Sequence, residues 1–227
     1  MKAAVYCGTR NLYEDMIPAL KSLLHNSDVD RVYLLIEDDK FPYELPDCVE
    51  CINISDQYWF KPDGPNFNNG WTYMVLMRAA LHRVFPNIDR ILSLDVDTIV
   101  AKDISELWNL PLDDYWLAAA KEPFKSRYRL YVNCGVMLLN LRKLRDDGKG
   151  DELIEALNTV RYGFNEQDCI AERCQGGMLV MPSDYNQNAY TDPTTTPKIV
   201  HFAAIKRWQD HPLVTMYRDM PWDQIRI

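Results

Sequence analysis

The sequence has no long apolar run. No window of its 227 residues approaches the roughly 18 apolar residues that a membrane span requires. The first residues, Met1 to Cys7, lead directly into an apolar stretch of strand type, without the longer apolar segment of a secretory signal peptide. We therefore expect a cytoplasmic protein.

The sequence also has no excess of basic residues. Lysine and arginine number 25 against 33 aspartates and glutamates, which gives a net charge of −8. This balance argues against a nucleic-acid backbone as the main partner. Residues 212–227 contain Arg218 and Arg226 as their only basic residues, so a basic tail that docks on a membrane is not expected.

Cysteines are few and scattered, and glycine is scarce where a phosphate loop would lie. The six cysteines are expected to be reduced thiols in a cytosolic chain. Cys48 and Cys51 form the one close pair, and they lack the second pair or nearby histidine that a zinc site needs. Gly8 stands alone after the first predicted strand, so no glycine-rich phosphate loop is present there.

The spacing of apolar residues predicts an α/β protein. Residues 3–7 and 31–36 read as strands, and between them apolar residues from Tyr13 to Leu24 recur at helical spacing. Such a β-α-β unit is typical of a parallel sheet, in which ligands bind at the carboxyl ends of the strands. The length fits one domain. We expect a single domain over residues 1–227, with a twisted mixed sheet flanked by helices.

The remaining elements follow from the same patterns. Further strands are predicted at 48–54, 90–100, 116–120, 133–141, 178–181 and 199–202, and further helices at 71–85, at 152–160 and from about residue 170. Residues 103–106, Asp-Ile-Ser-Glu, have the form of a capping box, which predicts that a helix starts there and that Asp103 is a cap and not a ligand.

Two carboxylates interrupt the strand predicted at 90–100. In an extended chain residues two apart point to the same side, so Asp95 and Asp97 can converge on one ion. Their burial would be costly unless a cation or a hydrogen-bond donor met them. Oxygen ligands of this kind suit Mg²⁺ or Mn²⁺, which are commonly shared with a substrate diphosphate. The alternative is a strand end that places two acids in a solvated turn.

Other polar groups stand beside predicted strands and helices. Asn133 and Gly135 lie at the start of the long apolar strand. The side-chain amide of Asn133 and the backbone of Gly135, which has no side chain, would let a ligand approach closely. Residues 165–168 place acids and amides at a positively polarised helix start, for which the alternative is plain N-capping. His201 lies in the last strand, where a lone histidine is more often a core residue. Residues 122–131 mix basic and aromatic side chains and form either a loop over a pocket or a solvated connector.

Taken together, these stretches resemble a known family. Leu94 to Asp97, Asn133 to Leu141, Asn165 to Asp168, and His201-Phe202 followed by Lys206-Arg207-Trp208 occur in the order found in the glycogenin-like retaining glycosyltransferases of family 8. That family includes the bacterial lipopolysaccharide galactosyl- and glucosyltransferases. The resemblance covers nearly the whole chain, and it implies a Rossmann-like nucleotide-sugar transferase fold of GT-A type.

The resemblance implies a metal ion and a UDP-sugar. Asp95 and Asp97 look like the metal-binding pair of the family, and His201 looks like its third protein ligand. One Mn²⁺ or Mg²⁺ would then be held together with the two phosphates of the donor. Lys206 looks like the lysine that contacts the diphosphate, and Arg78 matches a basic residue in the donor-site helix.

The rest of the implied donor site is spread along the chain. Cys7, Thr9 and Tyr13 occupy the places where family members hold and stack the uracil ring. The other implied donor contacts are Val96, Asn133, Cys134, Gly135 and Glu166. Gln167 and Asp168 resemble residues under the reacting carbon, and we assign them to stabilising an oxocarbenium-like sugar. Glu122 matches an acid expected in the sugar pocket.

The chain departs from the family pattern at three places. Glu166 replaces the first acid of an Asp-Gln-Asp stretch and is one methylene longer. Ala204 and Arg207 stand where the family usually carries a glycine before the lysine and a proline after it. The spacing from His201 to Lys206 is one residue short.

The sequence thus predicts metal-dependent, retaining transfer of a hexose, glucose or galactose, from a UDP-sugar to a saccharide or glycoconjugate acceptor. One alternative is a sugar nucleotidyltransferase, which would need more glycine after the first strand than Gly8. Another is a nucleotide-sugar binding protein without turnover. The acceptor itself is not defined by the sequence, because acceptor loops vary freely on a fixed scaffold.

Overall fold

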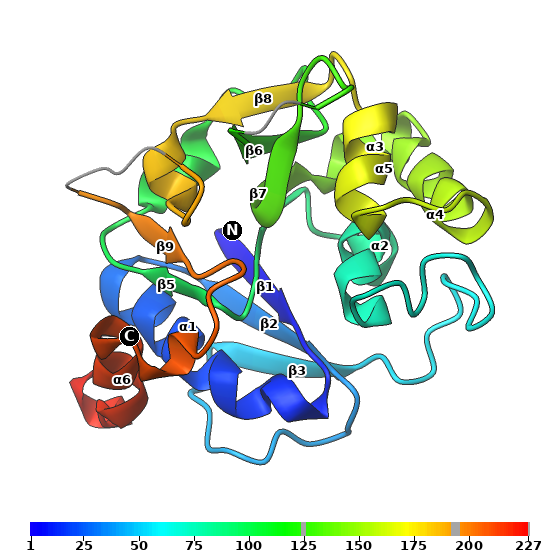
Figure 1. Ribbon diagram of the computed structural model, residues 1–227. Helices are drawn as coiled ribbons and strands as arrows, with labels where there is room; N and C mark the ends of the chain where they lie inside the picture. The colour runs from blue at the N-terminus through cyan, green and yellow to red at the C-terminus, as the bar shows by residue number, and fades with distance from the viewer. Residues whose placement is uncertain (124–125, 192–195, 227) are drawn as a thin grey trace.

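A seven-stranded sheet runs through the protein, with helices on both faces (Figure 1). The structure is a computed structural model that describes residues 1–123, 126–191 and 196–226. Two residues of the segment predicted at 122–131, Phe124 and Lys125, lie outside the described residues. The mixed, mostly parallel sheet predicted from the sequence is confirmed.

The order of the strands is β3-β2-β1-β4-β7-β6-β8. Their bounds are β1 Ala3–Cys7, β2 Arg31–Ile36, β3 Val49–Asn53, β4 Arg90–Leu94, β6 Leu117–Lys121, β7 Val132–Asn140 and β8 Met178–Met181. Strands β1 to β4 pair in parallel, β7 runs antiparallel to both of its neighbours, and β6 pairs in parallel with β8. The amino end of β7 therefore lies beside the carboxyl end of β4, and this places two polar stretches at one edge of the sheet.

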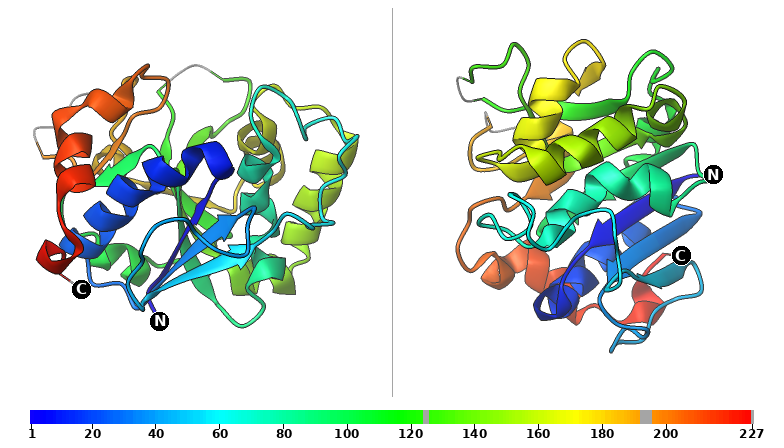
Figure 2. Two further views of the ribbon diagram at one scale, coloured as in Figure 1. Left: turned by 90° about the horizontal axis from the view of Figure 1, so that it is seen from below. Right: turned by 90° about the vertical axis from the view of Figure 1, so that its right-hand side faces the viewer.

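Helix α1, Tyr13–Asn26, covers one face of the sheet. Its apolar residues Met16, Leu20 and Leu23 are fully buried against that face, as the helical spacing predicted. Burial of each such side chain contributes about 1.5–3 kcal/mol. The other face is covered by α2 Met77–Val84, α3 Leu141–Asp146, α4 Lys149–Thr159 and α5 Asn165–Arg173. Figure 2 shows α1 and α2 on opposite sides of the sheet.

A second, two-stranded sheet lies beside the first one. It pairs β5, Thr98–Val100, antiparallel with β9, Ile199–His201, and helix α6, Pro212–Asp219, packs on it and on α1 (Figure 1). No helix among the described residues combines the length and the hydropathy of a membrane span.

Three local predictions were wrong in detail. The predicted strand 90–100 is two strands in different sheets, because the chain turns at 95–97, where the Thr98 amide donates to the Asp95 carbonyl (3.2 Å). Helix α5 begins at Asn165 and not near residue 170. The capping box does not start an α-helix: a short 3-10 turn follows, Asp103 bonds Ser105, and Glu106 bonds Tyr185 and Lys198 instead of closing the box.

Candidate active site

The acidic turn lies where two strands of opposite direction meet. Because β7 is antiparallel to β4, Leu94 pairs with Val136, and the next ladder bond runs from the Asp95 amide to the Gly135 carbonyl (2.8 Å). The two polar stretches, 95–97 and 133–135, are therefore adjacent in space. Asp95 and Asp97 converge because of the turn and not because of the strand alternation predicted from the sequence.

The pairing of β5 with β9 brings a histidine to the same place. Thr98 lies opposite His201 in the ladder, and the Phe202 amide donates to the Asp97 carbonyl (2.9 Å). His201 Nε2 lies 3.3 Å from Asp97 Oδ1 and 3.7 Å from Asp95 Oδ2. One ligand atom from each of these three residues lies within 4.8 Å of the others. The arrangement offers two carboxylate oxygens and one imidazole nitrogen to a cation.

A chain of hydrogen bonds fixes how His201 presents its ring. The Gly135 amide can only donate, so Asn133 faces it with Oδ1 (2.9 Å), and the same oxygen accepts from Asn186 Nδ2 (2.8 Å). Asn186 must then turn its own Oδ1 toward His201 Nδ1 (2.8 Å). Because an amide oxygen only accepts, Nδ1 carries the proton and the Nε2 lone pair faces the two acids. This is the tautomer that a metal-binding histidine requires.

Gly135 is required by the close approach of His201. A Cβ built on Gly135 would lie 2.8 Å from both ring nitrogens of His201, which is closer than such atoms pack. Any larger residue at position 135 would push the ring away from Asp95 and Asp97. The glycine expected to let a ligand approach instead makes room for the histidine.

Arg78 of α2 is buried between two acids. Its guanidinium, whose side chain is 9% exposed, donates to Asp95 and to Glu166, and thereby joins α2 to the acidic turn and to α5. Burial raises the pKa of Glu166, and Arg78 opposes this rise. Burial is the largest influence on the pKa of Asp97 and acts to raise it, but His201, a backbone hydrogen bond and Arg78 together outweigh burial, and the pKa of Asp97 is lowered. Together the three acids and Arg78 form one coupled electrostatic group.

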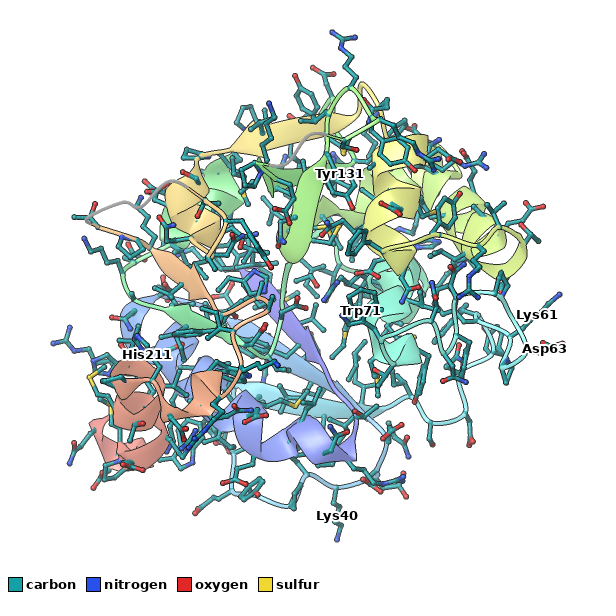
Figure 3. The ribbon with its side chains drawn as sticks, viewed as in Figure 1. Lys40, Lys61, Asp63, Trp71, Tyr131 and His211 are labelled. Atoms are coloured by element: carbon teal, nitrogen blue, oxygen red, sulfur yellow. The ribbon has the colours of Figure 1, made fainter. Side chains whose placement is uncertain are left out.

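A pocket of about 360 Å³ opens over this group. It is lined by Trp71, Val75, Arg78, Asp95, Asp97, Glu122, Tyr131, Asn133, Gly135, Phe164, Asn165, Glu166, Gln167, Tyr190, His201, Ala203 and Ala204. Figure 3 labels Trp71 beside α2 and Tyr131 near β7. Nine predicted residues, including Glu122, are thus brought together. Cys7, Thr9, Tyr13, Val96, Cys134, Asp168 and Lys206 are not among the lining residues.

Glu122 is one of the acids that line this pocket. Its side chain is almost fully buried, and its Oε1 accepts from Asn133 Nδ2 (2.6 Å). Its Oε2 finds no hydrogen-bond partner among the described residues. A buried carboxylate oxygen without a donor is costly. Glu122 therefore has one acceptor without a donor beside the pocket that it lines.

Gln167 and Asp168 take different places at the start of α5. The Oε1 of Gln167 accepts from the Cys134 amide (3.0 Å), so its amide is held at the floor of the pocket by β7. Asp168 accepts from the Tyr131 hydroxyl (2.8 Å) and from the Phe164 amide (3.0 Å). Asp168 therefore acts on the pocket through Tyr131 and Phe164, both of which line it.

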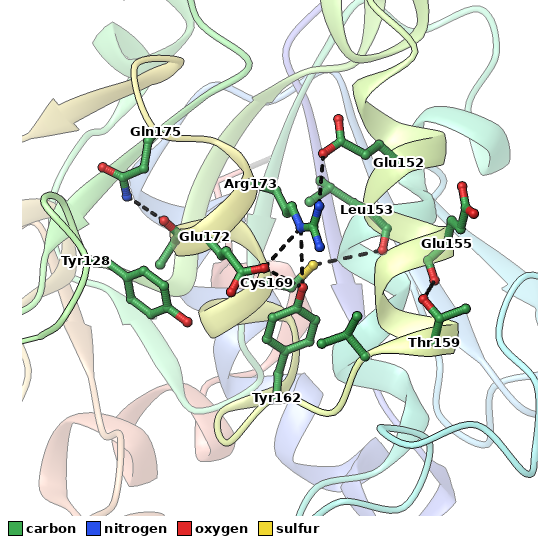
Figure 4. A network of polar contacts seen from close by, with 12 residues as sticks. Tyr128, Glu152, Leu153, Glu155, Thr159, Tyr162, Cys169, Glu172, Arg173 and Gln175 are labelled. Carbon is green, nitrogen blue, oxygen red and sulfur yellow. Dashed lines mark hydrogen bonds and ion pairs between the residues drawn. The ribbon is translucent and has the colours of Figure 1, made fainter.

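Helix α5 is held in place by polar contacts with its neighbours (Figure 4). Arg173 bridges Glu152 of α4 and its own neighbour Glu172, and it also contacts the Tyr162 hydroxyl. At the far end, Gln175 Nε2 donates to the Leu130 carbonyl (2.8 Å), which ties the end of the 122–131 segment to α5. The pocket wall that carries Glu166 and Gln167 is thus anchored from two sides.

The residues predicted to hold a uracil ring lie at the end of β1, outside this pocket. Tyr13 is 5% exposed and packs on Phe41 at 5.2 Å between ring centroids, so its ring faces are covered. Its hydroxyl contacts Asp38 and the Glu37 amide. Burial raises the pKa of Cys7 to about 12, which keeps it a neutral thiol.

Lys206 lies in an exposed loop after β9. Ala203 and Ala204 of that loop line the pocket, but Lys206 points to solvent. Ala204 has φ 61° and Arg207 has φ 57°, so left-handed residues flank the lysine. Left-handed backbone is costly for residues with a Cβ.

Several lining residues were missed at the sequence level. Trp71 is the first residue of a predicted helix and Phe164 directly precedes the predicted helix start at 165–168. Asn186, which contacts His201 without lining the pocket, lies in a stretch without any pattern. Their position follows from packing between distant segments, which local spacing does not encode. An exposed tryptophan beside a Pro-, Gly- and Asn-rich loop was the one available hint.

Most of the chain matches a known protein family. Residues 40–211 match the family model described as glycosyl transferase family 8, and this range contains the acidic turn, the start of α5 and His201. The chain belongs to glycosyl transferase family 8. The resemblance noted in the sequence is confirmed.

Two proteins of similar sequence are named as glycosyltransferases. The chain is 26% identical over 181 residues to glycosyltransferase GlyE of Streptococcus pneumoniae, which covers 74% of this chain and 42% of GlyE. It is 26% identical over 190 residues to lipopolysaccharide 1,2-glucosyltransferase of Escherichia coli, which covers 65% of this chain and 56% of that enzyme. The chain thus spans about half the length of these relatives.

Solved structures show the same fold. The crystal structure of GlyE matches 99% of this chain and 62% of that chain, with a TM-score of 0.75 and 21% identity. The galactosyltransferase LgtC, solved with donor and acceptor sugar analogues, matches 97% of this chain and 98% of that chain, with a TM-score of 0.66 and 17% identity. The GT-A type fold expected from the sequence is therefore confirmed.

Proposed function

We propose that this family 8 protein is a metal-dependent, retaining glycosyltransferase that moves a hexose, glucose or galactose, from a UDP-sugar to a saccharide or glycoconjugate acceptor. The observation that carries the proposal is the convergence of Asp95, Asp97 and His201 at the floor of a pocket. Membership in a family of glycosyltransferases favours this function over nucleotidyl transfer. A cytoplasmic location stays a prediction.

The donor set fits Mn²⁺ or Mg²⁺. Two carboxylates and the Nε2 lone pair of His201 make a mixed oxygen and nitrogen site without thiolate, which is the chemistry these ions accept. Such an ion, when bound, neutralises the negative charge that develops on a diphosphate leaving group. Asp95, Asp97 and His201 would hold it, with Asn133 and Asn186 orienting the imidazole.

The remaining side chains have complementary roles in the proposal. Arg78 provides a buried positive charge beside Asp95, which stabilises a developing phosphate charge. Glu166 and Gln167 face the donor sugar from the start of α5. Glu122 accepts a sugar hydroxyl on its free Oε2. Lys206 is kept as the diphosphate contact because Ala203 and Ala204 of its loop line the pocket.

The predicted uracil contacts, Cys7, Thr9 and Tyr13, remain part of the proposed donor site. The end of β1 adjoins the end of β4, which leads into the acidic turn, so a nucleotide can extend from the turn toward β1. Tyr13 would have to expose its ring by moving away from Phe41.

Hydrolysis of the donor without an acceptor tests this function. The purified protein with Mn²⁺ is incubated with UDP-glucose, UDP-galactose and their N-acetyl forms, and the release of UDP is measured. We expect slow hydrolysis of at least one donor, which EDTA and Asp97→Asn abolish. Asp113→Asn, on an exposed residue that pairs with Arg90, is the matched control and should keep wild-type turnover. Absence of binding and hydrolysis for all four donors would refute the proposal.

A further inference from the structure

The pocket has an aromatic rim. Trp71, Phe164 and Tyr190 all line it and are 49%, 56% and 48% exposed. They come from three separate segments, which precede α2, precede α5 and follow β8. Exposed aromatic side chains that gather at one pocket mark a site of molecular contact.

Trp71 and Phe164 form a fixed pair. Their ring centroids are 5.9 Å apart and their planes are tilted by 47°, so the two rings make an angled surface. The Phe164 amide donates to Asp168 Oδ2 (3.0 Å), which fixes the residue directly before the pocket residues of α5. Phe164 thus lies directly before Asn165 and two residues before Glu166, so the aromatic pair is next to the pocket residues of α5.

The two loops that carry this pair are tied together by a reciprocal amide contact. Asn69 Nδ2 donates to Asn165 Oδ1 (2.9 Å), and Asn165 Nδ2 donates to the Asn69 carbonyl (3.3 Å). Asn69 Nδ2 also donates to the Tyr162 carbonyl (2.6 Å). Asn165 has φ 43°, a left-handed conformation that these bonds maintain. A surface held in this way loses little freedom when a ligand binds.

The charged residues of the pocket below the rim favour one class of ligand. Among the described lining residues there are four acids, Asp95, Asp97, Glu122 and Glu166, whereas Arg78 is the one lysine or arginine, and it is already paired with two of the acids. An anionic acceptor or an anionic lipid surface would be repelled here, whereas the diphosphate of the proposed donor would be met by the cation that Asp95, Asp97 and His201 would hold. A neutral ligand with many hydroxyl groups is favoured, because hydroxyls can donate to carboxylates.

We propose that Trp71 and Phe164 form the acceptor platform, on which a neutral pyranose stacks its apolar C–H face while its hydroxyls point toward the acids of the pocket. This inference rests on the proposed function and names the substrate class of the acceptor. A pyranose presents one face of C–H groups and an edge of hydroxyls, which matches an aromatic rim above a carboxylate-lined floor.

Kinetics with simple glycosides test the platform. Methyl β-glucoside, methyl β-galactoside and lactose serve as acceptor probes, together with the hydrolysed UDP-sugar and Mn²⁺. Trp71→Ala and Phe164→Ala each remove apolar surface against which the sugar would pack, so each should raise the acceptor KM about 5- to 30-fold. Trp71→Phe should recover most of the loss. The Kd for UDP, measured by calorimetry, should change less than twofold.

A matched control and a charged probe complete the test. Tyr58→Ala removes an exposed aromatic side chain that is 82% exposed and lies outside the pocket, and it should leave the acceptor KM unchanged. Methyl β-glucuronide should be a much poorer acceptor than methyl β-glucoside, because its carboxylate cannot donate a hydrogen bond to Glu122.

Each contrary outcome has a distinct meaning. A parallel loss of UDP affinity in Trp71→Ala and Phe164→Ala would show that the rings stack the nucleobase, and would overturn the inference. So would an unchanged acceptor KM, or a wild-type protein that hydrolyses its donor but neither binds nor glycosylates any of the neutral probes. If the wild-type protein binds no UDP-sugar at all, the proposed function fails first.

Discussion

Replacement of Asn186 by leucine tests how His201 is oriented. Asn186 is fully buried and stands between Asn133 and the Nδ1 of His201. Leucine keeps the volume but accepts no hydrogen bond, so the Nδ1 proton loses its partner. The ring can then move its proton to Nε2, which lies 3.3 Å from Asp97 Oδ1 and can donate to it. That tautomer presents no lone pair to a metal ion.

The expected magnitudes follow from these contacts. One buried donor without a partner costs about 1–3 kcal/mol of unfolding free energy. Loss of an outer-shell partner of a metal-binding histidine lowers metal affinity about 10- to 100-fold. Mn²⁺ titration followed by electron paramagnetic resonance measures the affinity. Long-range ¹H–¹⁵N NMR reports the tautomer, and the chain has only four histidines to assign.

Asn188→Leu is the matched control. Asn188 is also buried and lies in the same segment, but its Oδ1 accepts from the Tyr190 amide (2.9 Å) and does not contact His201. We expect a loss of stability without a change of tautomer. The reasoning is refuted if Asn186→Leu keeps the Nδ1 proton on His201 and binds Mn²⁺ within twofold of the wild type.

Three further predictions concern stability. Ala204→Gly should raise the unfolding free energy by about 0.5–1 kcal/mol, because a left-handed alanine costs about 1–2 kcal/mol and the greater freedom of glycine in the unfolded chain offsets part of that gain. Urea unfolding measures this change. Ala203→Gly is the control and should destabilise the protein, because the φ of Ala203 is not left-handed. Gly135→Ala should lower the unfolding free energy by about 1–3 kcal/mol, because the new methyl group overlaps the His201 ring; wild-type stability would contradict this. The pKa of Asp151 is lowered, chiefly by its hydrogen bond from Arg83, so the stability that Asp151 contributes is present above its unfolded pKa of about 4 and is lost as the pH falls through its folded pKa. The difference in unfolding free energy between the wild type and Asp151→Asn should therefore shrink below about pH 4. A difference independent of pH would contradict this.

The sheet and helices were largely predictable because their patterns are local. The fully buried side chains of α1 recur at helical spacing, and residues 136–139 in the middle of β7 are an unbroken apolar run. The change of sheet at 95–97 was not predictable in this way. Leu94 and Thr98 belong to one continuous strand-like stretch of sequence. That the chain turns between them follows only from their pairing, because Leu94 pairs with β7 and Thr98 pairs with β9.

His201 shows what a local pattern leaves open. A lone histidine on a strand is usually a core residue, and His201 is indeed 2% exposed. It also faces Asp95 and Asp97, because the ladder sets it opposite Thr98. Strand register between segments a hundred residues apart is a property of the whole fold, so the order of the family motifs located this residue where periodicity could not.

The loop after β9 shows how the chain departs from its family without disturbing Asp95, Asp97 and His201. The Phe202 amide is bonded to the Asp97 carbonyl, which secures the chain directly after His201. Beyond that bond the backbone turns through two left-handed residues, Ala204 and Arg207. Proline has φ near −65° and cannot adopt the φ of 57° found at Arg207, so the usual proline is incompatible with this shorter loop. The difference is therefore confined to the segment that contains Lys206. Among the contacts that the family resemblance implies, this backbone alters the diphosphate contact assigned to Lys206.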